Sequence, residues 1–315
     1  MGIKIGTFFI YLTCISISIS FSQEKDSIKK VFSYKVNDSV LVDVNLSFKD
    51  GMPLFYSSHL ETGVCSDGLC KPISLTVYWD LLGSFMSYHT DDFYPLTKFD
   101  HIEMTKEDHE QLHNILSDTA SLLRDYYVED MIDIRKQVYS AKVDAVTRPT
   151  SATFENATVE GALYTVYTLW HFVNGEIRQR LIQYTHTLVT DSFISYMLQS
   201  DNRAYIKYIL EQTSDTQLIP FIPKMIELIA HTDDYIPHFA IARLKNATLE
   251  DPLYQKMVVH QMLIAKRHVQ NALLSRLETI SLESAAIDEL IVAIDTMDAT
   301  QLEKTAQILY NNRNR

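Results

Sequence analysis

The sequence predicts an α+β N-terminal domain with an antiparallel sheet, followed by an all-α domain of HEAT-like helical repeats. Apolar and polar residues alternate as in strands up to about residue 79, and helical spacing takes over after Thr105. From about Thr185 onward, the pattern is helical only. We therefore expect a signal peptide over 1–22, an α+β domain over 23–180 and a helical-repeat domain over 181–315.

The N-terminus has the features of a cleaved secretion signal. Lys4 precedes an apolar run from Ile5 to Ile19, and small residues stand at positions −3 and −1 of a cleavage site after Ser22. The mature chain is thus expected to be secreted or periplasmic. Cys14 is disfavoured as a lipid-attachment site, because Thr13 precedes it and the apolar run continues beyond it.

Composition argues against two kinds of partner. The net charge is −12 and no basic tract is present, so nucleic acid is not a predicted partner. Beyond the leader, no stretch approaches the ~18 apolar residues that a membrane span needs. The mature chain is therefore predicted to have no transmembrane segment.

Two cysteines, Cys65 and Cys70, remain after the leader is removed, and they flank a short turn. Cysteines this close in an oxidising compartment most simply form a disulfide. A metal site would need further ligands nearby. A redox-active pair normally has two residues between the cysteines, whereas four separate these.

Strands are expected in the first part of the chain. Alternating or β-branched residues cover 31–34, 40–48, 54–59 and 73–79. The sequence Lys49-Asp50-Gly51 marks a hairpin turn, because glycine accepts a positive φ. Together these segments predict an antiparallel sheet made of neighbours in sequence.

Helices follow the predicted sheet. A capping box at Thr105–Asp108 starts the first, a second is expected near 124–140, and the turn-rich stretch 147–151 follows it. A long helix, expected to begin near Thr153 and to carry Val159, is predicted to end at Asn174-Gly175.

The C-terminal half is predicted to form short helices. Each pair of helices takes up roughly thirty to forty residues, the repeat length of stacked helical repeats. Asp201, Ser281 and Asp298 are the expected caps, and an irregular bundle is the alternative. No Gly/Ser linker separates the halves near 175–190, so the two domains are expected to pack rigidly. The predicted segments are 188–199, 202–212, 217–230, 236–244, 253–267, 268–280, 283–296 and 300–310.

The segment His109-Glu110-Gln111-Leu112-His113 matches the H-E-x-x-H pattern. On a helix, His109 and His113 share a face that binds zinc in metallopeptidases, with Glu110 as general base. The charged residues before His109 indicate a solvated helix turn instead. No metal is predicted, and a zinc peptidase is the third hypothesis for function.

The segment Asp144–Thr150 precedes a helix expected near Thr153. Free N–H groups at a helix start favour an anion such as phosphate, and Arg148 adds a donor. Ordinary helix capping by Ser151 or Thr153 explains the same residues without a ligand.

This segment resembles the flavinylation motif of the FMN-binding domain family, found in flavin-carrying subunits of Rnf and Nqr electron-transport complexes. The family motif is D-[GA]-x-[ST]-[GS]-A-T, and its last threonine carries FMN through a phosphoester bond. Asp144, Thr147 and Thr150 match in register, and Thr150 falls on the modified position. Arg148-Pro149 departs from the family pattern.

A second segment, Ser58–Gly63, resembles the H-x-E-T-P-G sequence of the same family and precedes the first in the expected order. By this resemblance, which covers about residues 31–173, Glu61 and Thr62 line the flavin site and Asp144 orients the loop.

The resemblance implies an extracytoplasmic flavoprotein that relays electrons to a redox partner protein. A separate flavin transferase would attach FMN to Thr150, and the chemistry would belong to the cofactor. The alternative is a flavin-free binding or scaffold protein that docks a partner through its helical repeats. Arg148-Pro149 favours this alternative, because proline fixes φ and arginine lacks the conformational freedom of glycine.

Overall fold

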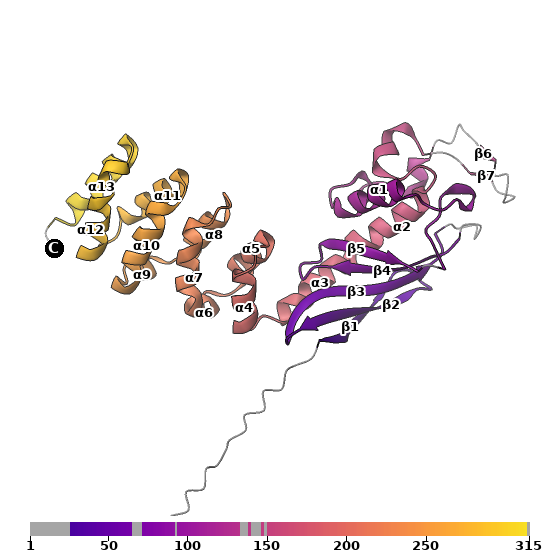
Figure 1. Cartoon of the computed structure of the whole chain (residues 1–315), viewed down its shortest axis with the longest axis horizontal. Coiled ribbons are helices and arrows are strands. Elements are labelled where there is room, and N and C mark those ends of the chain that lie inside the picture. The colour runs from indigo at the N-terminus through magenta and orange to yellow at the C-terminus, as the bar shows by residue number, and fades with distance from the viewer. Residues whose placement is uncertain are drawn as a thin grey trace, which may run out of the picture.

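The structure of the chain is a computed structural model that describes residues 26–64, 71–91, 93–132, 138–139, 146–147 and 150–313. It confirms the predicted layout, with an antiparallel sheet and its helices at one end and stacked helices at the other (Figure 1). The leader and both cysteines predicted to pair lie outside the described residues. Within the described ranges, no helix has the length and apolar character of a membrane span.

Five antiparallel strands form the sheet in the order of the sequence. Asp50 (φ 50°) and Gly51 (φ 77°) make the predicted hairpin turn between the second and third strands. The fifth strand was not predicted, and it follows a turn at Gly83, whose φ is 70°. The strands are β1 (Ser27–Lys35), β2 (Leu41–Lys49), β3 (Met52–Thr62), β4 (Ile73–Trp79) and β5 (Phe85–Thr90).

One face of the sheet is buried against helices α2 (Leu163–Asn174) and α3 (Glu176–Thr187). Leu46, Tyr56 and Trp79 form a row across three strands on this face, and all three are fully buried. The ring of Phe172 packs edge-on against Trp79 at a centroid distance of 5.6 Å. Alternation along the strands therefore fixes which face the helices cover.

The capping box predicted at Thr105 begins helix α1 (Lys106–Ser117). The helix predicted near 124–140 is wrong. Its described part holds the 3₁₀ helices η2 (Leu122–Arg124) and η3 (Val128–Met131), then β6 (Val138–Tyr139) paired with β7 (Val146–Thr147). The stretch from 122 to 131 fully buries only Leu123 and Met131, too few apolar contacts to hold an α-helix on the core.

Gly175 separates α2 from α3. The predicted end at Gly175 is confirmed, whereas the start near Thr153 and the inclusion of Val159 are wrong, because α2 begins at Leu163. A Cβ atom at Gly175 would lie 2.3 Å from the carbonyl oxygen of His171, so only glycine fits. The break coincides with the carbonyl of Val173 turning to the sheet, where Trp79 Nε1 donates to it at 3.0 Å.

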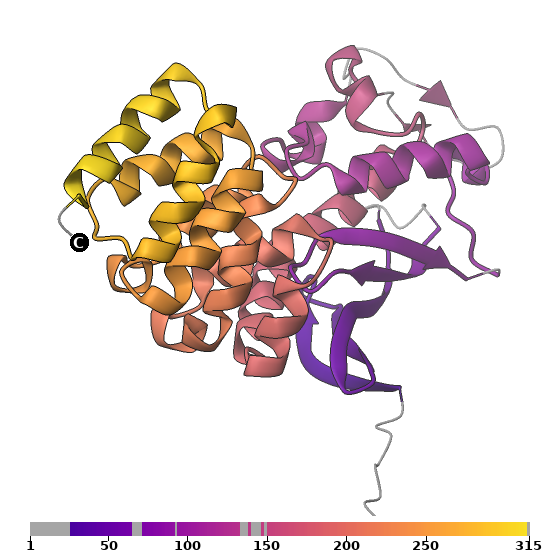
Figure 2. The ribbon, with the colours of Figure 1, turned by 60° about the vertical axis from the view of Figure 1, so that its left-hand side comes forward.

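The predicted helical segments of the C-terminal half are confirmed, and the helices stack side by side in sequence order (Figures 1 and 2). Asp298 caps the last helix as predicted. Asn202 rather than Asp201 caps α5, and Ser281 lies two residues before the N-cap of α12. The elements are α4 (Asp191–Leu198), α5 (Arg203–Gln212), α6 (Asp215–Leu218), η5 (Ile219–Phe221), α7 (Ile222–Glu227), η6 (Leu228–Ala230), α8 (Ile236–Arg243), α9 (Asn246–Leu249), α10 (Pro252–Ile264), α11 (Arg267–Leu277), α12 (Ser284–Val292), η7 (Ile294–Thr296) and α13 (Ala299–Asn311).

A repeated hydrogen bond links successive helix pairs. The C-cap carbonyl of α5, at Thr213, accepts a bond from Arg243 at 2.6 Å, and that of α8, at Leu244, accepts one from Arg276 at 2.7 Å. Asn311 donates in the same way to the C-cap carbonyl of α11 at 3.0 Å. After Gly175 the sequence has no glycine, the residue that often ends helices. Here, side chains of the next repeat donate hydrogen bonds to the carbonyl groups at these helix ends.

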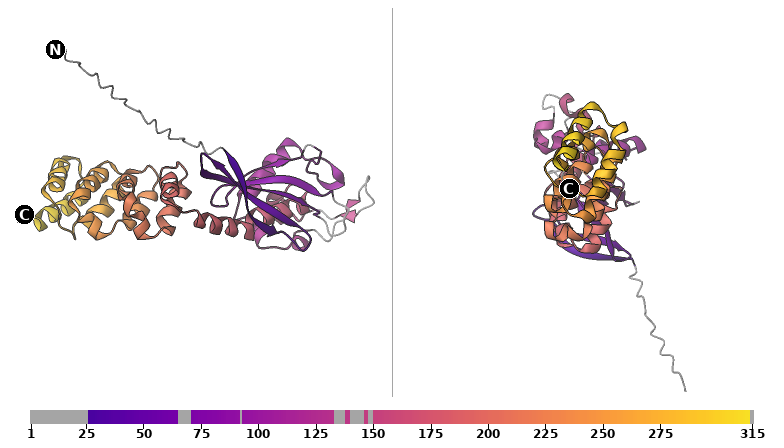
Figure 3. Two further views of the ribbon diagram at one scale, coloured as in Figure 1. Left: turned by 90° about the horizontal axis from the view of Figure 1, so that it is seen from below. Right: turned by 90° about the vertical axis from the view of Figure 1, so that its left-hand side faces the viewer.

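The boundary predicted at 175–190 is occupied by α3, which runs from beneath the sheet to the helical stack (Figure 3). Thr185, fully buried on α3, accepts a hydrogen bond from the Tyr56 hydroxyl at 2.7 Å and donates to the carbonyl of Leu81 at 2.5 Å. The N–H of Leu81 in turn donates to the hydroxyl of Tyr205 on α5. Sheet and stack therefore share one buried polar network.

Replacing Arg276 with alanine is expected to lower the free energy of unfolding by about 2–3 kcal/mol, because the carbonyls of Ile241 and Leu244 lose a charged donor. The urea midpoint, followed by far-UV circular dichroism, measures the effect. Arg180→Ala is the matched control. It removes an exposed i,i+4 pair with Glu176 and should cost less than ~0.5 kcal/mol. Equal shifts in the two variants would show that the carbonyl contacts add no stability.

Candidate functional site

Thr150, the predicted flavin attachment site, lies on a short backbone bridge. It pairs with Ile132, and the next residue, Ser151, donates its N–H to the carbonyl of Met131 at 2.8 Å. Met131 is fully buried, so this contact anchors the segment to the core while Thr150 itself stays half-buried. The hydroxyl-bearing residue is thus held at the surface by fixed backbone.

Exposed aromatic side chains precede this bridge in the chain. Tyr127, at the start of η3, is 76% exposed, and Tyr126 is 44% exposed. The ring of Tyr126 contacts that of Phe154 at 5.0 Å in an edge-on geometry. Aromatic rings of this kind offer flat surfaces on which a ring system can stack.

The rest of the predicted motif is only partly visible. Thr147 contributes backbone to β7, and Asp144 lies outside the described residues, as does Arg148-Pro149. The helix expected near Thr153 is a 3₁₀ helix over Ala152–Ala157. Ser151 occupies its N-cap without a side-chain bond. Because a six-residue 3₁₀ helix has little dipole, the anion-binding argument from a helix start loses its basis.

Glu61 and Thr62 lie at the end of β3, paired with Ser74 and Ile73 of β4. Glu61 is exposed, whereas Thr62 is buried and its hydroxyl donates to the carbonyl of Gly63 at 3.2 Å. Among the described residues, no hydrogen bond or ring contact joins this end of β3 to Thr150.

His109 and His113 both face β5 from α1. The hydroxyl of Tyr88 hydrogen-bonds to Nδ1 of His109 at 2.6 Å, and the His113 ring lies 5.2 Å from that of Phe85. Glu110 is exposed and pairs with Lys106 at 3.5 Å. In the part of the chain that the structure describes, no three His, Cys, Asp or Glu side chains gather where they could hold a metal ion.

Helix α10 carries a feature that sequence reasoning missed. Its buried side holds Gln255, Val258, Val259 and Met262. The opposite side carries three exposed apolar residues, with Leu253 69% exposed, Met257 36% and Ile264 63%, together with the exposed His260. We call these three side chains the α10 stripe. The signal in the sequence was an apolar residue on every side of this helix, a pattern that does not tell an exposed apolar face from a core face.

Neighbouring α12 also carries exposed apolar side chains. It packs against α10, with Lys256 and Glu289 bridging the two helices at 3.7 Å. At the end of α12, Ile291 is 49% exposed and Val292 83% exposed. Single exposed apolar residues are common, but a stripe with neighbours on the next repeat is typical of a contact surface.

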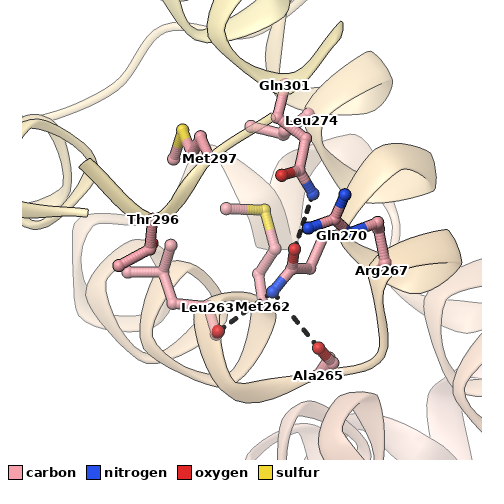
Figure 4. Close-up of a pocket in the computed structure, with 9 residues that line it drawn as sticks. All are labelled: Met262, Leu263, Ala265, Arg267, Gln270, Leu274, Thr296, Met297 and Gln301. Carbon is pink, nitrogen blue, oxygen red and sulfur yellow. Dashed lines mark hydrogen bonds between the residues drawn. The ribbon is translucent and has the colours of Figure 1, made fainter. Parts of the chain in front are cut away.

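A pocket of about 270 Å³ lies between α10, α11 and α13 (Figure 4). The Gln301 amide donates to Oε1 of Gln270 at 2.6 Å, and the Gln270 amide donates to the carbonyls of Leu263 and Ala265. These polar groups therefore satisfy one another and the end of α10, which indicates a structural role. The lining residues are Met262, Leu263, Ala265, Arg267, Gln270, Leu274, Thr296, Met297 and Gln301.

A half-buried histidine on α2 was also missed. The ring of His171 lies 4.3 Å from that of Tyr167 and hydrogen-bonds to the backbone of Leu123, while its Nε2 is buried without a partner among the described residues. Burial lowers the pKa of His171, and the bond to Leu123 offsets part of this effect.

The unfolded chain is therefore expected to bind more protons at this position than the folded chain below about pH 6.5. Stability linked to His171 is complete above that value and is lost as the pH falls. Thermal unfolding of His171→Phe should show a flatter dependence on pH than the wild type between about pH 7 and about pH 5. Tyr167→Phe, which keeps the imidazole, is the control and should retain the wild-type slope. Parallel curves for wild type and His171→Phe would contradict the prediction.

Comparison of the chain with models of protein families, with curated proteins and with solved structures gives no significant match in any of the three.

Proposed function

We propose that this chain is a binding protein that docks another protein on the outer face of its helical repeats. The observation that carries the proposal is the α10 stripe. Leu253, Met257 and Ile264 recur at helical spacing on a side of α10 that no described element covers. Burying such side chains contributes about 25 cal/mol for each Å² removed from water.

The chemistry of this face suits a protein partner. The flexible side chain of Met257 adapts to the shape of an opposing surface, and Ile291 and Val292 add exposed apolar side chains on the neighbouring helix. The net charge of −12 disfavours approach to an anionic lipid surface. A partner offering an apolar helix or loop is therefore the occupant we favour.

The sheet domain supports this role by fixing the stack in space. Since Tyr205 of α5 and Thr185 of α3 bond to the turn at Leu81, a partner bound to the repeats would be held in a set orientation relative to the sheet. Helical stacks of this kind present extended surfaces to partners.

A photo-reactive amino acid at position 257 should form an adduct with one partner in the cells that produce the protein. Glu303, exposed on α13, is the matched control position and should give no adduct. Adding Leu253→Glu should suppress the adduct at 257, because a charge then faces the apolar partner. Its effect on stability should stay within ~0.5 kcal/mol, since Leu253 is exposed.

An adduct that survives Leu253→Glu, or one that forms equally at position 303, would contradict docking on the α10 stripe. An adduct between two copies of this chain would show that the α10 stripe mediates self-association and does not dock a different protein.

The flavoprotein hypothesis is kept as the second candidate, because one observation favours it. Thr150 is anchored by the bridge to Ile132 and by the N–H of Ser151 on the buried Met131, and it remains partly exposed. The exposed Tyr126 and Tyr127 precede it in the chain. Under this proposal a transferase outside the cytoplasm moves the FMN group of FAD to the Thr150 hydroxyl, with cleavage of the FAD pyrophosphate bond and release of AMP. The attached flavin then relays electrons to a redox partner.

Co-expression with a flavin transferase, followed by intact mass and peptide mapping, tests this candidate. The flavoprotein proposal expects one FMN on the Thr150 peptide, lost in Thr150→Ala and kept in the control Thr153→Ala. The same spectra report cleavage after Ser22 and the oxidation state of Cys65 and Cys70. An unmodified wild-type chain would leave the binding function alone, with Arg148-Pro149 as the reason that the loop is not recognised.

A further inference from the structure

Four rings meet where α1 packs on β5. Phe85 and Tyr88 come from the strand, with ring centroids 6.4 Å apart, and His109 and His113 come from the helix. His109 lies 5.9 Å from Tyr88, and His113 lies 5.2 Å from Phe85. The two imidazoles therefore sit over one pair of aromatic rings, on one side of α1.

The position of α1 fixes both histidines. Its buried side, made by Leu112, Ile115 and Leu116, sets the rotation of the helix about its axis. Its first turn is held by the capping box, and Asp108 also pairs with the largely buried Lys98 at 2.6 Å. Residues at i and i+4 of such a helix have Cβ atoms about 5–6 Å apart, close enough for two imidazoles to share one ion.

Tyr88 selects which nitrogen of His109 is available. Its hydroxyl occupies Nδ1 at 2.6 Å, so Nε2 is left to bind a ligand. When Nδ1–H donates to the tyrosine oxygen, Nε2 carries the lone pair. A metal-bound histidine usually has a hydrogen bond of this kind at its other nitrogen, which orients the ring. His109 is half-buried and His113 is exposed, so the site is open to solvent.

We propose that His109 and His113 form a two-histidine binding site for a divalent transition-metal ion, with copper(II) bound most tightly. Imidazole nitrogen suits copper, nickel and zinc, and affinity among these ions peaks at copper. Water fills the remaining coordination positions. Glu110 pairs with Lys106 and adds no oxygen ligand, so calcium and magnesium are not expected to bind.

The site is independent of partner docking and of flavin attachment, because it lies on α1 and β5, away from both α10 and Thr150 in sequence and by element. It needs no third protein ligand and implies no peptidase activity. Its role is to bind a metal ion, and its affinity for the ion depends on how rigidly α1 holds the two imidazole rings.

The test is a titration of the tag-free mature chain with copper(II), followed by calorimetry and by the visible absorption of imidazole-bound copper. One equivalent should bind at this site. His113→Ala and His109→Ala should each weaken that binding at least tenfold, and Tyr88→Phe should weaken it by about 10–100-fold. His260→Ala removes an exposed histidine on α10 and should leave the binding unchanged.

His113 is exposed, so its alanine variant should keep the wild-type urea midpoint and leave the result readable. Copper binding that is unchanged in both His113→Ala and His109→Ala would overturn the proposal. So would calcium or magnesium competing for the copper site at comparable concentration.

Discussion

The carbonyl groups at the ends of short helices are the constraint on which this structure depends. A helix of eight to thirteen residues leaves its last four carbonyls without intrahelical donors. A large share of its backbone carbonyls therefore needs donors from outside the helix. Most proteins meet part of this need with a glycine after the helix. The chain has no glycine after Gly175, and side chains from the following repeat donate hydrogen bonds to these carbonyls instead.

This arrangement couples neighbours into a stack. Arg243 and Arg276 occupy equivalent places in successive repeats, and each reaches back to the C-cap carbonyl of the preceding one. The same device appears in the N-terminal domain, where Trp170 and Asn174 of α2 donate to the carbonyls of Asp118 and Leu116 at the end of α1. Each helix pair is therefore completed only by its neighbour, as expected for a one-dimensional repeat structure.

The junction between sheet and stack applies the same physics to a buried site. Tyr56, Thr185 and Leu81 form a chain of hydrogen bonds with no exposed member, and an unpaired group there would cost about 1–3 kcal/mol. Such a network specifies a single way for the domains to meet. Under the proposed function, the apolar stripe on α10 is presented on a rigid support, which would lower the entropy lost on binding a partner.

Periodicity and capping residues determined much of this architecture from the sequence alone. Alternation predicted four of the strands, Thr105 and Asp108 predicted the start of α1, and Asn174-Gly175 predicted the end of α2. These features are local, because a residue's face or cap depends on neighbours within one turn or one strand. The tertiary structure determined the contacts between distant residues, which local patterns do not encode.

It decided that the described stretch 122–131 forms 3₁₀ turns, in which Leu123 and Met131 alone are fully buried apolar anchors. It brought the Tyr88 hydroxyl to His109. It also left Leu253 and Ile264 exposed, although an apolar residue in a helix is predicted to be buried until its neighbours are known. Contacts between residues far apart in the sequence, such as Tyr88 and His109, depend on packing, and periodicity carries no information about them.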